Sequence, residues 1–138
     1  MKIALSLAVL LCLALVVGCA SDTQSQSLND TLETYRKTIR WDAPRTAAQF
    51  LHPEQRPNER QLGFQISRLE QFKVSGYQTS GPGSFDPDGQ YVQTVQINLS
   101  NRHTAVEKVL VDRQTWQWDE ERERWWLTSG LPDAARAQ

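Results

Sequence analysis

The sequence has two cysteines and two histidines, residue types that can act as nucleophiles, general bases or metal ligands: Cys12, Cys19, His52 and His103. Neither histidine has a second His or Cys at a spacing typical of a metal site. A general base also needs an orienting acid beside it in a cleft, and the sequence indicates no such pair. We therefore expect no metal, no cofactor and no enzymatic activity.

Tryptophans could supply a different chemistry, the binding of a sugar ring or of a partner protein. Four of the five lie between positions 116 and 126. With a hairpin turn at positions 120–121, Trp116 would face Trp125, and Trp116, Trp118 and Trp125 would share one face as a candidate binding surface. The alternative, which we favour for most of these rings, is core packing, since each buries roughly 150–250 Å².

The beginning of the chain has the order of a secretory signal. Met1-Lys2 is positively charged, and Ile3–Val17 is apolar except for Ser6. The apolar run is shorter than the roughly 20 residues of a membrane-spanning helix. The segment Val16-Val17-Gly18-Cys19 that follows resembles the lipobox of bacterial lipoproteins. An ordinary signal peptide cleaved nearby is the alternative interpretation.

The lipobox resemblance implies cleavage after Gly18 and a lipid on Cys19. Several acyl chains on one residue hold a protein stably at a bilayer without a spanning helix. In the resembled family an Asp directly after the cysteine often retains the protein at the inner membrane, and here Asp22 stands later. We therefore expect the periplasmic face of the outer membrane, with the inner membrane as the alternative.

Charge and cysteine content narrow the remaining classes. Lys2 is the only charged residue before Cys19, so 14 of the 15 basic residues and all 16 acidic residues follow it. This balance gives no basic surface of the kind that nucleic acids require. Cys19 would be the only cysteine left after cleavage, so no disulfide can form within the domain.

Composition also divides the mature chain. The segment 19–27 is polar and without period, which predicts a flexible tether behind the lipidated cysteine. We expect one domain over 28–132, of the usual size for a single core. The small, polar tail 133–138 is predicted to be frayed.

Periodicity predicts helices first and strands later within this domain. Leu28, Leu32, Tyr35 and Ile39 fall on one helical face. Asp42 is a candidate N-cap for a second, shorter helix, and 59–69 is ambiguous. Period-two alternation predicts four strands, over 72–77, 91–99, 106–118 and 124–128.

This order predicts an α+β fold, with N-terminal helices packed on a curved four-stranded antiparallel sheet. It is similar to the NTF2-like and cystatin-like cone fold. Some members of that fold are enzymes, and an enzyme or ligand binder would need a deep, largely apolar cavity, which we place near Trp41, Tyr77 or His52. We expect a non-enzymatic binding or assembly module with an envelope protein or glycan as partner; the alternative is a small-molecule-binding or catalytic cone.

Overall fold

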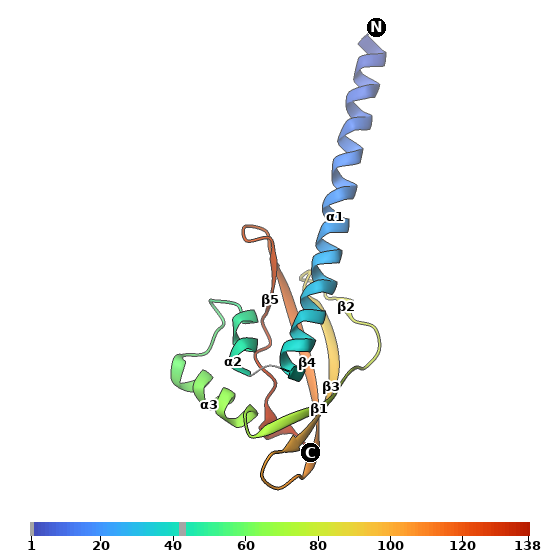
Figure 1. The fold of residues 1–138 in the computed structure, drawn as a ribbon. Helices are drawn as coiled ribbons and strands as arrows, with labels where there is room; N and C mark the ends of the chain where they lie inside the picture. Colours follow the sequence, from blue (N-terminus) through green and yellow to red (C-terminus); the bar gives the residue numbers. More distant parts are fainter. Residues whose placement is uncertain (1, 42–43) are drawn as a thin grey trace. The chain divides into compact units, whose positions relative to one another are not determined.

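The computed structural model describes residues 2–41 and 44–138, with side chains from Asp22 onward in these ranges. The chain forms two compact units, one ending at Leu32 and the other comprising residues 33–138. Helix α1 (Lys2–Trp41) runs through the first unit and contributes its last residues to the second (Figure 1).

The segment 19–27, predicted to be a flexible tether without regular structure, is helical and lies within α1. Its Gln residues are good helix formers, and extending an existing helix adds one hydrogen bond for each residue that is fixed. Low hydrophobicity predicted the absence of a core here, but that does not by itself exclude a helix. Asp42, the predicted N-cap of the next helix, lies outside the described residues.

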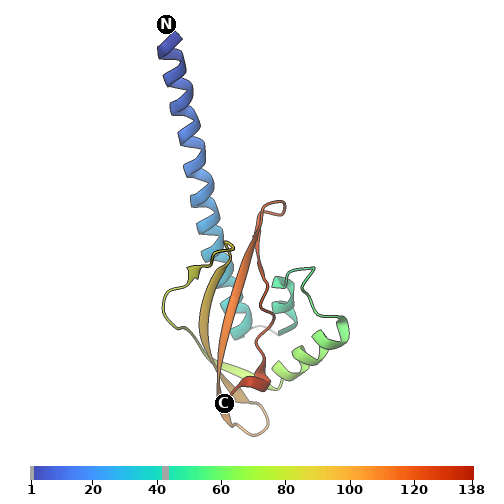
Figure 2. The ribbon, with the colours of Figure 1, turned by 180° about the vertical axis from the view of Figure 1, so that it is seen from behind.

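The second unit confirms the α+β prediction, with helices packed against a strongly curled antiparallel sheet, consistent with a cone-like fold. The sheet order is β1-β3-β4-β5, and a short β2 pairs with β3. Figures 1 and 2 show α2 and α3 on one side of this sheet. The remaining elements are α2 (Pro44–Ala47), the 3₁₀ helix η1 (Ala48–Phe50), α3 (Glu59–Leu69), β1 (Phe72–Thr79), β2 (Ser84–Phe85), β3 (Tyr91–Asn101), β4 (Glu107–Asp119), β5 (Arg124–Leu127) and the 3₁₀ helix η2 (Ala134–Arg136).

Helix α3 resolves the ambiguous segment in favour of the helical period. The Asn58 side chain caps it by accepting a hydrogen bond from the Gln61 backbone N–H at 2.9 Å. Leu62, Ile66 and Leu69 are buried at i, i+4 and i+7. The helix therefore places one apolar face on the sheet and ends where β1 begins.

Aromatic rings join the end of α1 to the sheet. Tyr35 is fully buried and makes edge-to-face contacts with Phe50 of η1 and Trp116 of β4, at centroid distances of 5.3 and 5.1 Å. Ile97, Leu99 and other buried residues of β3 and β4 continue this core along the concave face. The last residues of α1 are thus fixed against the centre of the sheet.

The C-terminal tail corrects the prediction of a frayed end. Gln138 exchanges two backbone hydrogen bonds with Val109 of β4, at 2.7 and 3.0 Å. Ala134 and Ala137 are buried, and the Asp133 side chain caps η2. Small residues suit this position because they let the tail lie close to the sheet edge, so small size here reflects packing rather than disorder.

Candidate functional site

The hairpin tryptophans are mainly structural. Trp116 and Trp125 are buried, whereas Trp118 is half-buried. The three do share one face, but the register differs from the predicted one: Trp118 pairs with Trp125, and Trp116 pairs with Leu127. As a candidate binding surface this face therefore offers only Trp118, whose ring lies 5.4 Å from that of Trp125.

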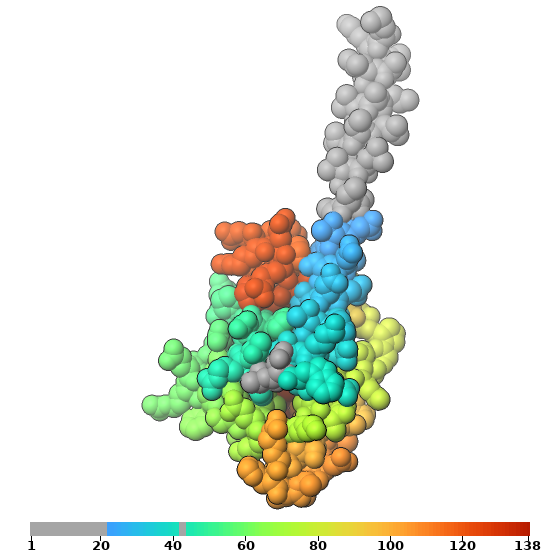
Figure 3. Space-filling model, in the orientation of Figure 1, coloured from blue at the N-terminus to red at the C-terminus, as the bar shows by residue number. Residues whose placement is uncertain are grey.

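The β4–β5 turn explains the change of register. The Asp119 side chain accepts hydrogen bonds from the backbone N–H groups of Glu121 and Arg122, both at 3.0 Å, and Glu123 adopts φ 48°. The turn is therefore longer than two residues, and it forms the orange-red group of atoms in Figure 3. The backbone N–H of Arg122 and its side chain both donate to the Asp119 carboxylate. These hydrogen bonds, of which the backbone one has the larger effect, lower the pKa of Asp119 to about 2.

His52 lies at the opposite face of this hairpin, beside Trp126. Its ring approaches Trp126 edge-on at 6.1 Å, and its Nδ1 accepts from the Glu54 backbone N–H. The guanidinium of Arg124 lies 3.8 Å above the Trp126 ring. His52 and Trp126 therefore form a packed surface cluster, apart from the other predicted pocket residues.

Tyr77 belongs to a buried polar network on the concave face. The Gln114 amide nitrogen donates to the Tyr77 hydroxyl at 3.0 Å and to Asp112 Oδ2 at 2.9 Å, while its oxygen accepts from Gln93 at 2.8 Å. Burial raises the pKa of Asp112 and raises that of Tyr77 to about 12. One glutamine thus connects three strands through side-chain hydrogen bonds.

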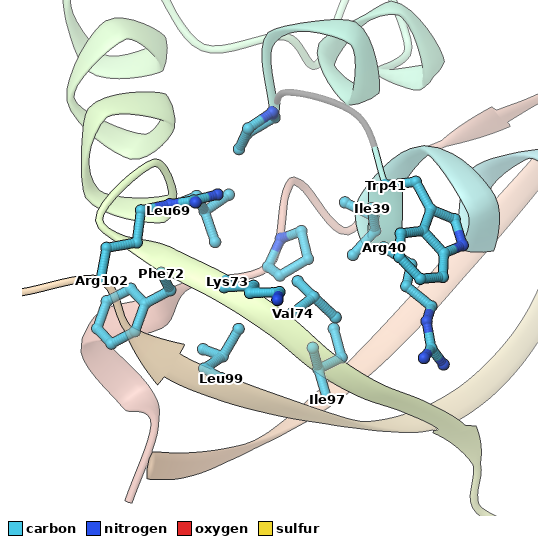
Figure 4. A pocket seen from close by; sticks show the side chains of 12 residues that line it. Ile39, Arg40, Trp41, Leu69, Phe72, Lys73, Val74, Ile97, Leu99 and Arg102 are labelled. Atoms are coloured by element: carbon cyan, nitrogen blue, oxygen red, sulfur yellow. The ribbon is translucent and has the colours of Figure 1, made fainter. Parts of the chain in front are cut away.

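A pocket lies beside Trp41, between the end of α1, the end of α3 and the sheet (Figure 4). Its volume is about 70 Å³. Figure 4 shows Trp41 and Arg40 at one end, Phe72 and Arg102 at the other, and sheet residues between them. The lining is Ile39, Arg40, Trp41, Pro44, Leu69, Phe72, Lys73, Val74, Ile97, Leu99, Arg102 and Pro132.

The pocket combines an apolar floor with cationic side chains. Arg40, Lys73 and Arg102 are its charged residues, and none of the twelve lining residues is acidic. Arg102 is fixed by a hydrogen bond from its Nε to the Glu70 carbonyl oxygen at 3.0 Å. The Arg40 guanidinium lies 4.9 Å from the centroid of the Trp41 ring, which is 72% exposed. Trp41 is therefore available at the surface beside Arg40, and Arg102 lies at the other end of the pocket.

The structure brings one of the three predicted pocket residues to this pocket. Trp41 lines it, whereas Tyr77 lies in the polar network and His52 beside Trp126. Sequence reasoning missed Lys73 and Arg102 because they belong to β1 and to the β3–β4 turn, which only the fold brings near α1. No local signal could have found them, because the alternation in β1 sets Lys73 on the opposite strand face from Phe72 and Val74.

Two further findings concern residues 22–41 and 44–138. No group of three or more His, Cys, Asp or Glu side chains in these ranges is arranged to hold a metal ion. No helix of this part is both long enough and apolar enough to span a membrane. Comparisons of the chain with protein-family models, with curated proteins and with solved structures found no match.

Proposed function

We propose that the chain is an envelope lipoprotein, anchored through Cys19, whose domain is a non-enzymatic binding module. The anchor is supported by the signal-like segment that ends in Val16-Val17-Gly18-Cys19. Its place is the periplasmic face of the outer membrane, with the inner membrane as the alternative. The partner is an envelope protein; the hairpin tryptophans offer less support for a glycan, because Trp116 and Trp125 are buried.

The pocket beside Trp41 is the observation that carries the binding role. An exposed tryptophan adjoins an apolar recess and basic side chains, and Trp and Arg are enriched where protein interfaces bind most strongly. A volume of about 70 Å³ is well below the roughly 300–1,000 Å³ of sites for drug-sized ligands. These dimensions favour recognition of a partner surface over enclosure of a cofactor.

A second candidate function is a small-molecule-binding or catalytic cone. The inward polar network favours it, because Asp112 has a raised pKa and lies beside Gln114. The network is also internally bonded, since Gln114 connects Asp112, Tyr77 and Gln93. A purely structural network predicts that a library of small metabolites does not raise the melting temperature of the full chain. A ligand that raises it in the parent chain and not in Asp112→Asn would support the cone.

The anchor and the binding role have separate tests in a Gram-negative host. Replacing Cys19 by Ser should release the protein from the membrane fraction or block its maturation, and unchanged fractionation would contradict the anchor. A photo-crosslinking side chain at position 41 should give a discrete adduct. The same side chain at Phe85, which is 59% exposed and does not line the pocket, is the matched control. Equal crosslinking at both positions would contradict the binding role of the pocket.

A further inference from the structure

We infer that the pocket beside Trp41 receives one apolar side chain from an acidic segment of a partner protein. The inference rests on the proposed binding function and adds the chemistry of the partner. Three properties of the described residues carry it: the sign of the charge around the pocket, its volume, and the arrangement of Trp41 with the arginines.

The charge around the pocket is positive. Arg40, Lys73 and Arg102 come from three separate segments, the end of α1, β1 and the β3–β4 turn, and all three line the same pocket. Among the described residues, the ion pairs involve other basic side chains, namely Arg36, Lys37, Arg45, Arg68 and Arg122. The Glu70 backbone carbonyl accepts the hydrogen bond from Arg102. The Glu70 carboxylate instead lies 4.0 Å from the guanidinium of Arg45. Charge complementarity therefore favours a partner with acidic groups around its contact residue.

The volume sets the size of what enters. About 70 Å³ is roughly half of the 150 Å³ engineered cavity that binds benzene. Its apolar lining includes Leu69, Phe72 and Leu99, which would desolvate a small aliphatic group. A branched side chain such as leucine or valine fits this description, whereas a whole lipid chain or a nucleotide exceeds it.

Trp41 and the arginines form a surface that is already arranged for contact. The hydrogen bond from Arg102 Nε to the end of α3 holds this guanidinium before any partner arrives. The contact between Arg40 and the Trp41 ring orients the second arginine. Side chains held in this way lose less conformational freedom on binding. The apolar part is recessed behind charged side chains, which suits an inserted side chain better than a flat membrane surface.

The test uses the full chain in phosphatidylcholine nanodiscs and a fluorescent nonapeptide with one central leucine flanked by Asp and Glu. Anisotropy should show binding of this peptide. Changing the central leucine to alanine, or the flanking acids to their amides, should each weaken binding at least about fivefold. The inference is overturned if either altered peptide binds as tightly as the leucine peptide, or if the leucine peptide does not bind at all. This arm uses the unmodified protein.

Protein variants give the second arm. Lys73→Glu and Arg102→Glu should each weaken binding at least about fivefold. Arg60→Glu makes the same charge change at an exposed position outside the lining and should not. Equal loss in all three would overturn the inference, and circular dichroism checks that each variant folds.

A parallel arm replaces the peptide with phosphatidylglycerol vesicles. If the chain binds the vesicles and not the peptide, and the two pocket variants weaken vesicle binding, the surface would be assigned to a membrane. If the peptide does not bind, but fractionation still depends on Cys19 and position 41 still gives a crosslink, only the proposed partner chemistry is rejected.

Discussion

The hairpin tryptophans and Trp41 use the same side chain for opposite purposes. Trp116 has no exposed surface and contacts the buried ring of Tyr35, whereas Trp41 is 72% exposed beside a small cationic pocket. Clustering in the sequence draws attention to the hairpin. The fold shows that clustered rings fill a small core, while the isolated ring remains available for contact.

The surroundings explain this difference. A domain of this length has little apolar area, so its largest side chains are needed where helix and sheet meet. Trp41 instead is the last residue of α1, is largely exposed and lies next to Arg40. The comparison predicts that changes in the hairpin reduce stability and that changes beside Trp41 reduce binding.

Trp116→Ala should have the largest effect on stability. It removes a buried ring and leaves a cavity beside Tyr35 and Phe50, so we expect a loss of about 3–5 kcal/mol in the free energy of unfolding. Urea unfolding followed by circular dichroism measures it. A loss below about 1 kcal/mol would mean that this ring is not part of the core.

Gln114→Met should have the next largest effect. The methionine keeps the volume but leaves the Tyr77 hydroxyl and Gln93 without the amide that bonds them, which costs about 1–3 kcal/mol. Gln96→Met is the control, because Gln96 lies on the same sheet outside this network and should change stability by about 0.5 kcal/mol or less. Equal losses in the two variants would assign the effect to strand propensity rather than to the network.

Asp112→Asn tests the same buried region through pH. Burial raises the folded-state pKa of Asp112, partly offset by the hydrogen bond from Gln114 and the charge of Arg136. The folded protein therefore binds the proton of the Asp112 carboxyl more tightly than the unfolded chain does. The contribution of Asp112 to the free energy of unfolding consequently falls as pH rises from about 4 through the raised pKa. Relative to the parent, the variant should gain more stability at pH 7 than at pH 4. A gain that is independent of pH would contradict the raised pKa.

Arg124→Ala should cost less, because Arg124 is exposed and its stacking on Trp126 contributes about 0.5–1 kcal/mol. Arg113→Ala is the control, since Arg113 is an exposed arginine of β4 without such a ring contact among the described residues. Thermal unfolding of both variants at low and high salt gives the measurement. Equal changes would show that the stacking on Trp126 contributes nothing.

Local patterns were sufficient for much of the fold but not for the pocket. The helical period of Leu28–Ile39, the alternation in β3 and the change from helices to strands are properties of neighbouring residues, so the α+β class could be predicted. The register of the hairpin depends on the length of the turn after Asp119. The sequence is compatible with a two-residue turn and with a longer one, so the register could not be predicted from it. The pocket depends on Lys73 and Arg102 meeting the end of α1, and no local period encodes that contact. The tail was mispredicted because its small residues also suit close packing at the edge of β4.

Trp41→Ala should have the smallest effect on stability and completes the comparison. An exposed ring contributes little to folding, so the free energy of unfolding should change by about 0.5 kcal/mol or less. Binding of the acidic leucine peptide should nevertheless fall by about tenfold or more, because Trp41 lies at the end of the pocket and positions Arg40. Urea unfolding and anisotropy on the same preparation measure the two quantities. A variant that loses stability as Trp116→Ala does, while still binding the peptide, would mean that Trp41 is a core residue and that the two tryptophan environments do not differ in function.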